Sequence, residues 1–206
     1  MKFFFNVGRY FMMLKRVFAR PEKHKMYFRQ LFHEIDNLGV NSVGIVVIIS
    51  IFIGGIMVIQ FAYSMMNPLY PIELVGLGTR DTLLLEFSST MLALIMAGKI
   101  GSNITSEIGT MRVTEQIDSL EIMGVNSASY LILPKIVAVV LIFPFLYILS
   151  VFFGLIGGLF TGSIAGVISV KDYIDGIQYL FYPYYVTFSI IKSLVFGFLV
   201  ASVRSE

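Results

Sequence analysis

Two charged residues lie inside long apolar stretches of the chain, Glu86 in one and Lys192 in another. A charge at the centre of a bilayer costs at least about 2.5–3.5 kcal/mol on insertion scales, so such charges usually face a bundle interior or a water-filled cavity. Glu86 lies about one turn from the expected outer end of its helix and could simply reach the membrane surface, whereas Lys192 lies near mid-span, where reaching the surface is harder. Both residues are therefore candidates for a site within the membrane.

A second group of charges lies in the segment SEIGTMRVTEQIDSLEIMG, residues 106–124. At about 100° per residue, residues 107–123 form a helix with its acids in a sector of about 120° and apolar residues opposite. The acids are Glu107, Glu115, Asp118 and Glu121. Because the cytoplasmic leaflet repels acids, this face should point away from the membrane, towards water or a protein. The segment is either a helix that docks a partner or a solvated helix between two spans.

Several common chemistries have no candidate residues in the sequence. The chain has no cysteine, which excludes disulfides and thiolate metal sites, and His24 and His33 fit no metal-ligand spacing. The stretch GKIGSN at 98–103 lacks the Ser or Thr and the upstream Gly of a P-loop. No nucleophile–base pair is recognisable, and the basic residues lie beside a span. The sequence therefore predicts no catalytic residue, metal, cofactor or nucleic-acid partner.

The elements that must position these residues are membrane helices. Hydrophobic residues make up 57% of the chain, and the mean hydropathy is +0.84. No charged residue occurs between Asp36 and Glu73 or between Lys135 and Lys171, and both windows exceed the roughly 20 apolar residues that a helical span needs. The predicted fold class is an all-α, polytopic membrane protein, with a single membrane domain over residues 1–206.

Four spans are predicted, separated by charged or proline-containing segments. They cover residues 43–66, 82–106, 130–166 and 183–203. The apolar stretch 136–170 would be about 50 Å long as a helix, against a hydrocarbon core of about 30 Å. It is therefore one long helix, tilted or kinked at Pro144, or two short helices. Asn67 and Pro68 end the first span, and 67–81 is expected to be an external loop.

The N-terminal region is strongly basic. Residues 1–33 hold eight Lys or Arg and a single acid, Glu22, so the positive-inside bias predicts a cytoplasmic N-terminus. Apolar residues recur there at spacings of three and four, at Phe3, Val7, Tyr10, Leu14 and Val17. This periodicity predicts, within 1–36, an amphipathic helix on the membrane surface. A helix packed on other protein is the alternative.

Glycines recur every four residues in the third apolar stretch. They are Gly154, Gly158, Gly162 and Gly166. Positions four apart share one side of a helix, and small side chains let helix backbones approach closely in a membrane. The row predicts a helix-packing surface, which serves either a contact within the chain or the pairing of two subunits.

Residues 97–138 carry the most specific pattern in the chain. Their sequence, AGKIGSNITSEIGTMRVTEQIDSLEIMGVNSASYLILPKIVA, closely resembles the signature of the MlaE family, the permease subunits of bacterial ABC-type phospholipid transporters. The Glu-Ile-Gly-Thr-Met, Thr-Glu-Gln-Ile-Asp and Glu-x-Met-Gly elements match in order, and a weaker resemblance that includes IIKSLVFGF at 190–198 runs over nearly the whole chain. Two features depart from the family. The family usually has an Arg or another polar residue before this Glu and a Pro soon after it, whereas LLLEFSSTM at 83–91 has Leu85 before Glu86 and no Pro. Family members also continue into a further C-terminal span.

The resemblance implies that 107–123 is a coupling helix seated in a groove of a cytoplasmic ABC ATPase. The residues implied in that contact are Glu107, Met111, Arg112, Glu115, Gln116, Asp118 and Glu121. ATP would then be bound by the partner subunit, which fits the missing P-loop, and this chain would not itself be an enzyme. Glu86 and Lys192 would line the path of a phospholipid.

By the same resemblance the chain would be a multi-pass protein of the bacterial inner membrane that works as a homodimer with a periplasmic MCE-domain lipid carrier. It would move phospholipid between the inner membrane and the periplasm or outer membrane. The residues alone leave two other functions open: a secondary transporter or channel that uses Glu86 and Lys192, or a membrane scaffold without transport. A copurifying ATPase separates the first function from the other two.

Overall fold

The computed structural model describes residues 24–65, 70–122 and 127–204, together with four single positions nearer the N-terminus. Within these ranges the regular secondary structure is entirely helical and no strand occurs, which confirms the predicted all-α class. The surface helix predicted from the apolar positions between 3 and 17 falls on residues that, except for single positions such as Val17, lie outside the described ranges.

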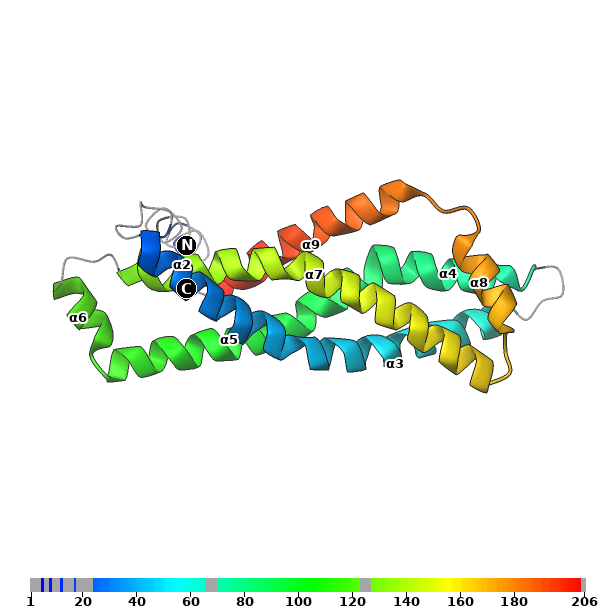
Figure 1. Cartoon of the computed structure of the whole chain (residues 1–206), viewed down its shortest axis with the longest axis horizontal. Helices are drawn as coiled ribbons and strands as arrows, with labels where there is room; N and C mark the ends of the chain where they lie inside the picture. Colours follow the sequence, from blue (N-terminus) through cyan, green and yellow to red (C-terminus); the bar gives the residue numbers. More distant parts are fainter. Residues whose placement is uncertain are drawn as a thin grey trace. The chain divides into compact units, whose positions relative to one another are not determined.

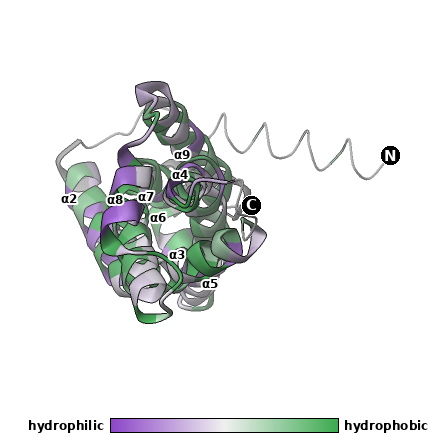
Figure 2. Cartoon of the chain, turned by 90° about the vertical axis from the view of Figure 1, so that its right-hand side faces the viewer, coloured by the Kyte–Doolittle hydropathy of each residue, from purple (hydrophilic) through white to green (hydrophobic). Residues whose placement is uncertain are grey.

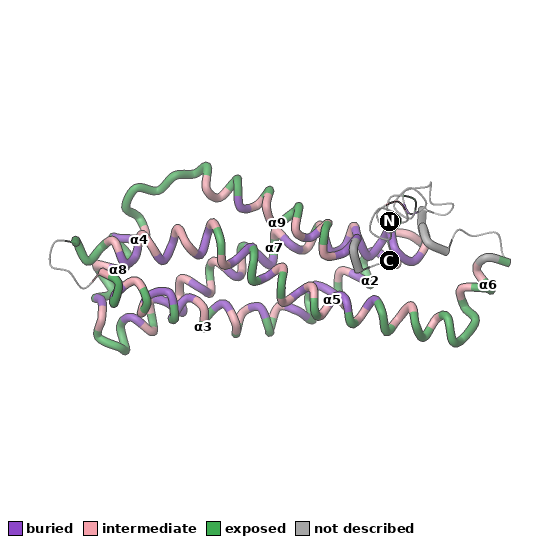
Figure 3. Tube along the Cα trace, turned by 180° about the vertical axis from the view of Figure 1, so that it is seen from behind, coloured by how far each residue is buried: buried purple, intermediate pink, exposed green. Residues whose placement is uncertain are grey.

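Within the described part of the chain, four helical stretches are long and apolar enough to cross a membrane, as predicted. They comprise Tyr27–Ser64, Glu73–Val113, Tyr130–Ile164 and Pro183–Ser202. Buried and exposed residues alternate along these helices at helical spacing (Figure 3). Each helix therefore has one side packed against protein and another side available to lipid.

The first stretch contains α2 (His24–Glu34), a π-helical segment η1 (Ile35–Val40) and α3 (Asn41–Ser64). These elements follow one another as one helical run (Figure 1), and α3 matches the span predicted over 43–66 to within two residues at each end. Most of α3 is coloured as hydrophobic (Figure 2). A helix that is apolar on all sides is typical of an element placed between lipid and protein.

The second stretch contains α4 (Glu73–Thr82), a π-helical segment η2 (Leu83–Phe87) and α5 (Ser88–Val113). The prediction of an external loop over 67–81 is therefore wrong from Glu73 onward, and the helix begins nine residues before the predicted span. The acidic Glu73 in the first turn interacts favourably with the helix dipole. Buried Val75, Gly76 and Thr79 lie along α4, which packs against α8 (Val170–Gln178).

The acidic helix predicted over 107–123 is broken in two. α5 ends at Val113, a turn follows at Thr114 and Glu115, and α6 runs over Gln116–Ile122. Glu115 has a φ of 56°, a left-handed conformation that costs roughly 1–2 kcal/mol for a residue with a Cβ. The left-handed residue Glu115 marks the break, and the single acidic sector expected for a continuous helix does not form.

The third apolar stretch is one helix, α7 (Ser127–Ile164), which decides between the two alternatives left open by the sequence.

The starts of the last two helices are set by local sequence. The Ser169 hydroxyl accepts a hydrogen bond from the Asp172 N–H at 3.1 Å and so caps the first turn of α8. The last helix, α9 (Pro183–Arg204), begins with a proline, which lacks only a hydrogen bond that the first helical position never makes. α9 matches the predicted span 183–203 to within one residue.

The chain is divided between two compact units, whose boundaries fall within α3, α5, α7 and α9. Unit 1 contains Met1–Ser42, Ala93–Phe143 and Val195–Glu206, and unit 2 contains Val43–Leu92 and Pro144–Leu194. A core of unit 2 gathers Val58, Ala62, Val75, Ile168 and Tyr173. Burial raises the pKa of the Tyr173 phenol, which stays protonated and donates a hydrogen bond to the Leu155 carbonyl oxygen at 3.2 Å.

Candidate functional site: two ion-paired lysines

The two intramembrane charges found in the sequence meet in unit 2. The Lys192 ammonium on α9 lies 3.1 Å from a carboxylate oxygen of Glu86 and donates a second hydrogen bond to the Leu85 carbonyl oxygen at 2.8 Å. The side chain of Lys192 is 19% exposed and that of Glu86 is 67% exposed. The direct pair, which the sequence left open, is therefore present and accessible.

A π-helical turn, η2, places Glu86 in this position. Its wider winding, from Leu83 to Phe87, presents two backbone carbonyls to side chains from other helices. The Tyr147 hydroxyl on α7 donates to the Leu84 carbonyl oxygen at 3.1 Å, and Lys192 donates to that of Leu85. Single π-helical turns within α-helices often occur at functional sites. No feature of the LLLEF sequence predicted this turn.

Glu86 also lines an open pocket of about 180 Å³. The other lining residues are Phe87, Thr90 and Met91. The pocket thus combines a carboxylate and a hydroxyl with an aromatic ring and a thioether. Such a lining suits a ligand that has both a charged and an apolar part.

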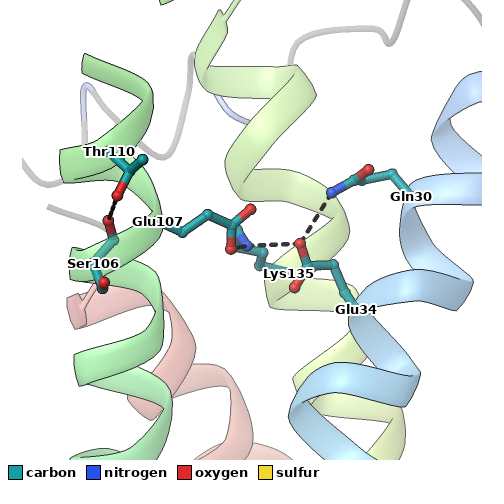
Figure 4. A network of polar contacts seen from close by, with 6 residues as sticks. All are labelled: Gln30, Glu34, Ser106, Glu107, Thr110 and Lys135. Atoms are coloured by element: carbon teal, nitrogen blue, oxygen red, sulfur yellow. Dashed lines mark hydrogen bonds and ion pairs between the residues drawn. The ribbon is translucent and has the colours of Figure 1, made fainter. Parts of the chain in front are cut away.

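A second cluster of charges, which we call the Lys135 cluster, lies in unit 1 and consists of Glu34, Glu107 and Lys135. The Lys135 ammonium on α7 lies 2.6 Å from a carboxylate oxygen of Glu34 on α2 and forms a second ion pair with Glu107 on α5 (Figure 4). The amide of Gln30 donates to the same Glu34 oxygen at 3.1 Å. Lys135 and Glu34 are each 1% exposed, whereas Glu107 is 30% exposed.

Sequence reasoning missed this cluster. Lys135 marked only the start of an apolar stretch, and Glu34 was not singled out, because both lie where charges are ordinary, near the ends of predicted spans. The two carboxylates are 101 and 28 residues from Lys135 in sequence, so no spacing within one helix could reveal the contact. One signal for the cluster was available: Lys135 has apolar residues on both sides in sequence, and a lysine in such surroundings needs a counter-charge.

The residues predicted for a partner contact are divided by the structure. Glu107 belongs to the Lys135 cluster and is separated from the others. Arg112, Glu115, Gln116 and Asp118 are exposed, and Met111 is half-buried. No residue with a described side chain from Glu107 to Ile122 is buried (Figure 3). Glu121 lies in α6, and its side chain is outside the described part of the structure.

The predicted glycine row packs helices within the chain at three of its four positions. Gly154, Gly158 and Gly162 are buried, and a methyl group added at Gly54 on α3 would overlap the Gly154 backbone on α7. Gly166 does not belong to the row, because it lies in the turn after α7 with a φ of +66° and open space around it. The prediction did not include Gly157, where an added methyl would overlap the backbone of Ile51 on α3. These contacts hold α3 against α7 within unit 2.

Arg80 has a structural role that the sequence did not predict. It was assigned to an external loop, yet it lies in α4 and is buried. Its guanidinium donates hydrogen bonds to the carbonyl oxygens of Ile177, Tyr179 and Leu180 at 2.6, 2.8 and 3.3 Å. These groups lie at and after the C-terminal end of α8, where carbonyls lack helical partners and a cation is favourable. Arg80 therefore holds the end of α8 against α4.

The arrangement of these side chains suits the binding of a charged ligand. Among the residues whose positions are described, no three His, Asp or Glu side chains are grouped as metal ligands would be. The Lys192–Glu86 pair offers a cation and an anion beside an open pocket, and the Lys135 cluster offers a buried connection between three helices.

Comparison with known proteins covers nearly the whole chain. Residues 31–205 match the family described as Permease MlaE. A probable ABC transporter permease protein of Synechocystis is 31% identical over 193 residues, which are 93% of this chain and 72% of the relative. The intermembrane phospholipid transport system permease protein MlaE of Haemophilus influenzae is 34% identical over 161 residues, 78% of this chain and 61% of the relative.

A plant relative matches over a similar range. The chloroplastic protein TRIGALACTOSYLDIACYLGLYCEROL 1 of Arabidopsis thaliana is 28% identical over 194 residues, which are 90% of this chain and 53% of the relative. The family match includes both ion-paired lysines and, except for residues 27–30 of the first, all four apolar stretches. This multi-pass membrane protein therefore belongs to the MlaE family of permeases.

Proposed function

We propose that this chain is the membrane subunit of an ABC transporter that moves phospholipid between the inner membrane and the periplasm or outer membrane. ATP is hydrolysed by a separate cytoplasmic subunit. The family and the names of the relatives support a transporter of this type. The observation that carries the proposal is the Lys192–Glu86 pair, whose carboxylate lines an open pocket with apolar walls.

A phospholipid has a charged headgroup and apolar chains, and the site has groups for both. Lys192 offers an ammonium to the phosphate, and Glu86 offers a carboxylate to a headgroup amine. Phe87 and Met91 offer apolar surface in the same pocket. Because the Glu86 side chain is mostly uncovered by other parts of the chain, a headgroup can reach its carboxylate without displacing protein groups.

The end of α5 and α6 together form the segment that docks the ATPase in this proposal. Arg112, Glu115 and Asp118 are exposed there, and Val113 and Ile122 expose apolar side chains beside them. Exposed apolar groups rimmed by polar ones are typical of an interaction surface. The basic N-terminus and the two intervening spans favour the cytoplasm for this end.

The remaining partners in this proposal are those that the resemblance to the family implies. Two copies of the chain form the transporter, and a periplasmic MCE-domain protein exchanges lipid with them. A secondary transporter is the alternative that the Lys192–Glu86 pair also suits, because an intramembrane ion pair can serve a proton path. The energy source distinguishes the two.

The test of the proposed function is to purify the chain from its own cells with its bound proteins and lipids, and to reconstitute the complex in vesicles that contain labelled phospholipid. We expect an ABC ATPase to copurify and lipid transfer to require hydrolysable ATP. Transfer that runs on an ion gradient without ATP would support the alternative and contradict the proposal, as would the absence of any ATPase from the complex.

The docking segment has a separate test. Reversing charge at both Glu115 and Asp118 by substitution with lysine should weaken copurification of the ATPase while the chain still inserts in the membrane. Asp175→Lys is the matched control, because it reverses an exposed acid on α8, outside the proposed segment. Normal copurification and transport in the double variant would show that this face does not dock the ATPase.

A further inference from the structure

The Lys135 cluster joins three helices through one ammonium group (Figure 4). Glu107 lies six residues before the end of α5, and α6 begins three residues after that end. Of the ion pairs in residues 24–65, 70–122 and 127–204, Glu107–Lys135 is the nearest in sequence to α6. The cluster therefore fixes the helix end to which the proposed docking segment is attached.

The two carboxylates of the cluster are not equivalent. Glu34 is as buried as Lys135, whereas nearly a third of the Glu107 side chain is open to solvent. If Glu107 leaves, water can solvate its carboxylate, and Lys135 keeps Glu34 as its partner, so no buried charge is left unpaired. If Glu34 were to leave, a buried carboxylate would lose its counter-charge. Only the Glu107 contact can open at low cost.

The charge balance of the cluster also favours this opening. Two carboxylates share one ammonium, so the closed cluster holds one excess negative charge. One oxygen of Glu34, Oε2, has no hydrogen-bond partner among the described residues. When Glu107 departs, the remaining Glu34–Lys135 pair is neutral. The closed arrangement has a second ion pair and the open arrangement has balanced charge, so the contact with Glu107 can exist in two states.

We propose that Lys135 is a positioning residue for transport and that its contact with Glu107 is a detachable tie between the docking segment and helices α2 and α7. The tie closes to hold the end of α5 in place and opens once in each cycle of the ATPase. This inference rests on the proposed function, because it requires a partner that moves α6. The acid that opens is Glu107, and Glu34 remains paired throughout.

The test uses the whole complex in vesicles and measures both ATP hydrolysed and phospholipid transferred. In Glu107→Gln the closed tie is weakened, so the ATPase should still bind and hydrolyse ATP, while lipid moved per ATP falls about fivefold or more, the lower end of usual coupling effects. Asp175→Asn, the same change at an exposed acid on α8, is the matched control and should leave the ratio unchanged.

Glu34→Gln should give the opposite result. Lys135 then has Glu107 as its only charged partner in the cluster, so opening the tie would strand a buried ammonium. We expect hydrolysis and transfer to fall together, each by about fivefold or more, with lipid moved per ATP retained. Lys135→Arg keeps a cation between both acids and should preserve the ratio. A merely structural brace would give both glutamine variants the same defect, in folded protein rather than in the ratio.

Three results would overturn the inference. A wild-type ratio in Glu107→Gln would show that the contact does not couple the segment to the spans. Loss of the folded complex in that variant would show a brace instead of a tie. A lowered ratio in Glu34→Gln would show that the two acids are equivalent. In each case ATP-dependent transfer by the unaltered complex would leave the proposed function standing, whereas its absence would remove both.

Discussion

Lys135 and Lys192 are the same residue type in the same kind of helix, yet their surroundings differ. Lys135 is buried with two carboxylates, one of them equally buried. Lys192 is partly exposed and pairs with the carboxylate of Glu86, which lines an open pocket. Removing one partner of a buried ion pair leaves an uncompensated buried charge, whereas a pair with an uncovered carboxylate can be reached by a ligand. The buried pair is suited to joining helices, and the accessible pair to binding a ligand.

The rest of each unit reinforces this difference. In unit 2 the close contact of α3 with α7 is made by glycine backbones rather than by charges, and the Lys192–Glu86 pair joins other elements, α9 and η2. In unit 1 the Lys135 cluster links α2, α5 and α7. Removing Lys135 should therefore mainly affect stability, whereas removing Lys192 should mainly affect ligand binding.

The largest effect is expected for Lys135→Met. This change leaves Glu34 buried beside Glu107 without a cation, and removal of one partner of a buried ion pair typically costs about 3–5 kcal/mol. Thermal unfolding of the purified chain in detergent should show a lower melting temperature than for Lys171→Met, which changes an exposed lysine on α8. Equal melting temperatures would contradict the assignment of a structural role to the buried lysine.

The next largest effect is expected at the close glycine contact between α3 and α7 in unit 2. In Gly54→Ala the new methyl group overlaps the Gly154 backbone, so α3 and α7 must separate, at a cost of about 1–3 kcal/mol. Gly44→Ala lies in the same helix with open space around it and should be neutral or slightly stabilising, by up to about 1 kcal/mol. Similar unfolding of the two variants would mean that close packing does not hold unit 2.

The smallest effect is expected for Tyr147→Phe. The Tyr147 hydroxyl bonds the Leu84 carbonyl of the π-helical turn that positions Glu86. Loss of one such hydrogen bond costs about 0.5–1.5 kcal/mol, and the turn should become less well fixed. We expect a modest fall in stability and a partial fall in lipid transfer, measured in vesicles. A fall in stability with transfer unchanged would show that the turn does not position Glu86 for transport.

The sequence predicted the parts of this protein that depend on bulk polarity. Long apolar stretches, two of them without any charge, predicted the four spans, and the cost of a charge in the membrane singled out Glu86 and Lys192, which form an ion pair in the structure. It could not predict the Lys135 cluster, because the cluster depends on which of several helix ends meet in space. The break at Thr114 and Glu115 and the π-helical turn at Leu83–Phe87 depend on a few backbone angles, which the apolar periodicity does not encode.

Helix α4, which occupies most of the predicted external loop, was missed for a related reason. Arg80 reads as a solvated base when only its neighbours in sequence are considered. Its partners are the carbonyls after α8, about a hundred residues later, and they make burial of the guanidinium favourable. The role of a charged residue between two spans, and the side of the membrane on which it lies, therefore cannot be assigned without knowing its contacts in the folded chain.

The measurement that tests the central claim most directly is ATP-dependent phospholipid transfer by the reconstituted complex carrying Lys192→Ala, alongside its melting temperature. Loss of a charged hydrogen bond to the headgroup, worth about 1.5–3 kcal/mol, corresponds to a fall in transfer of roughly tenfold to a hundredfold, and folding should be unaffected because the pair is accessible. Lys171→Ala should transfer lipid at the wild-type rate. Wild-type transfer by Lys192→Ala, or unfolding in place of lost transfer, would contradict the account.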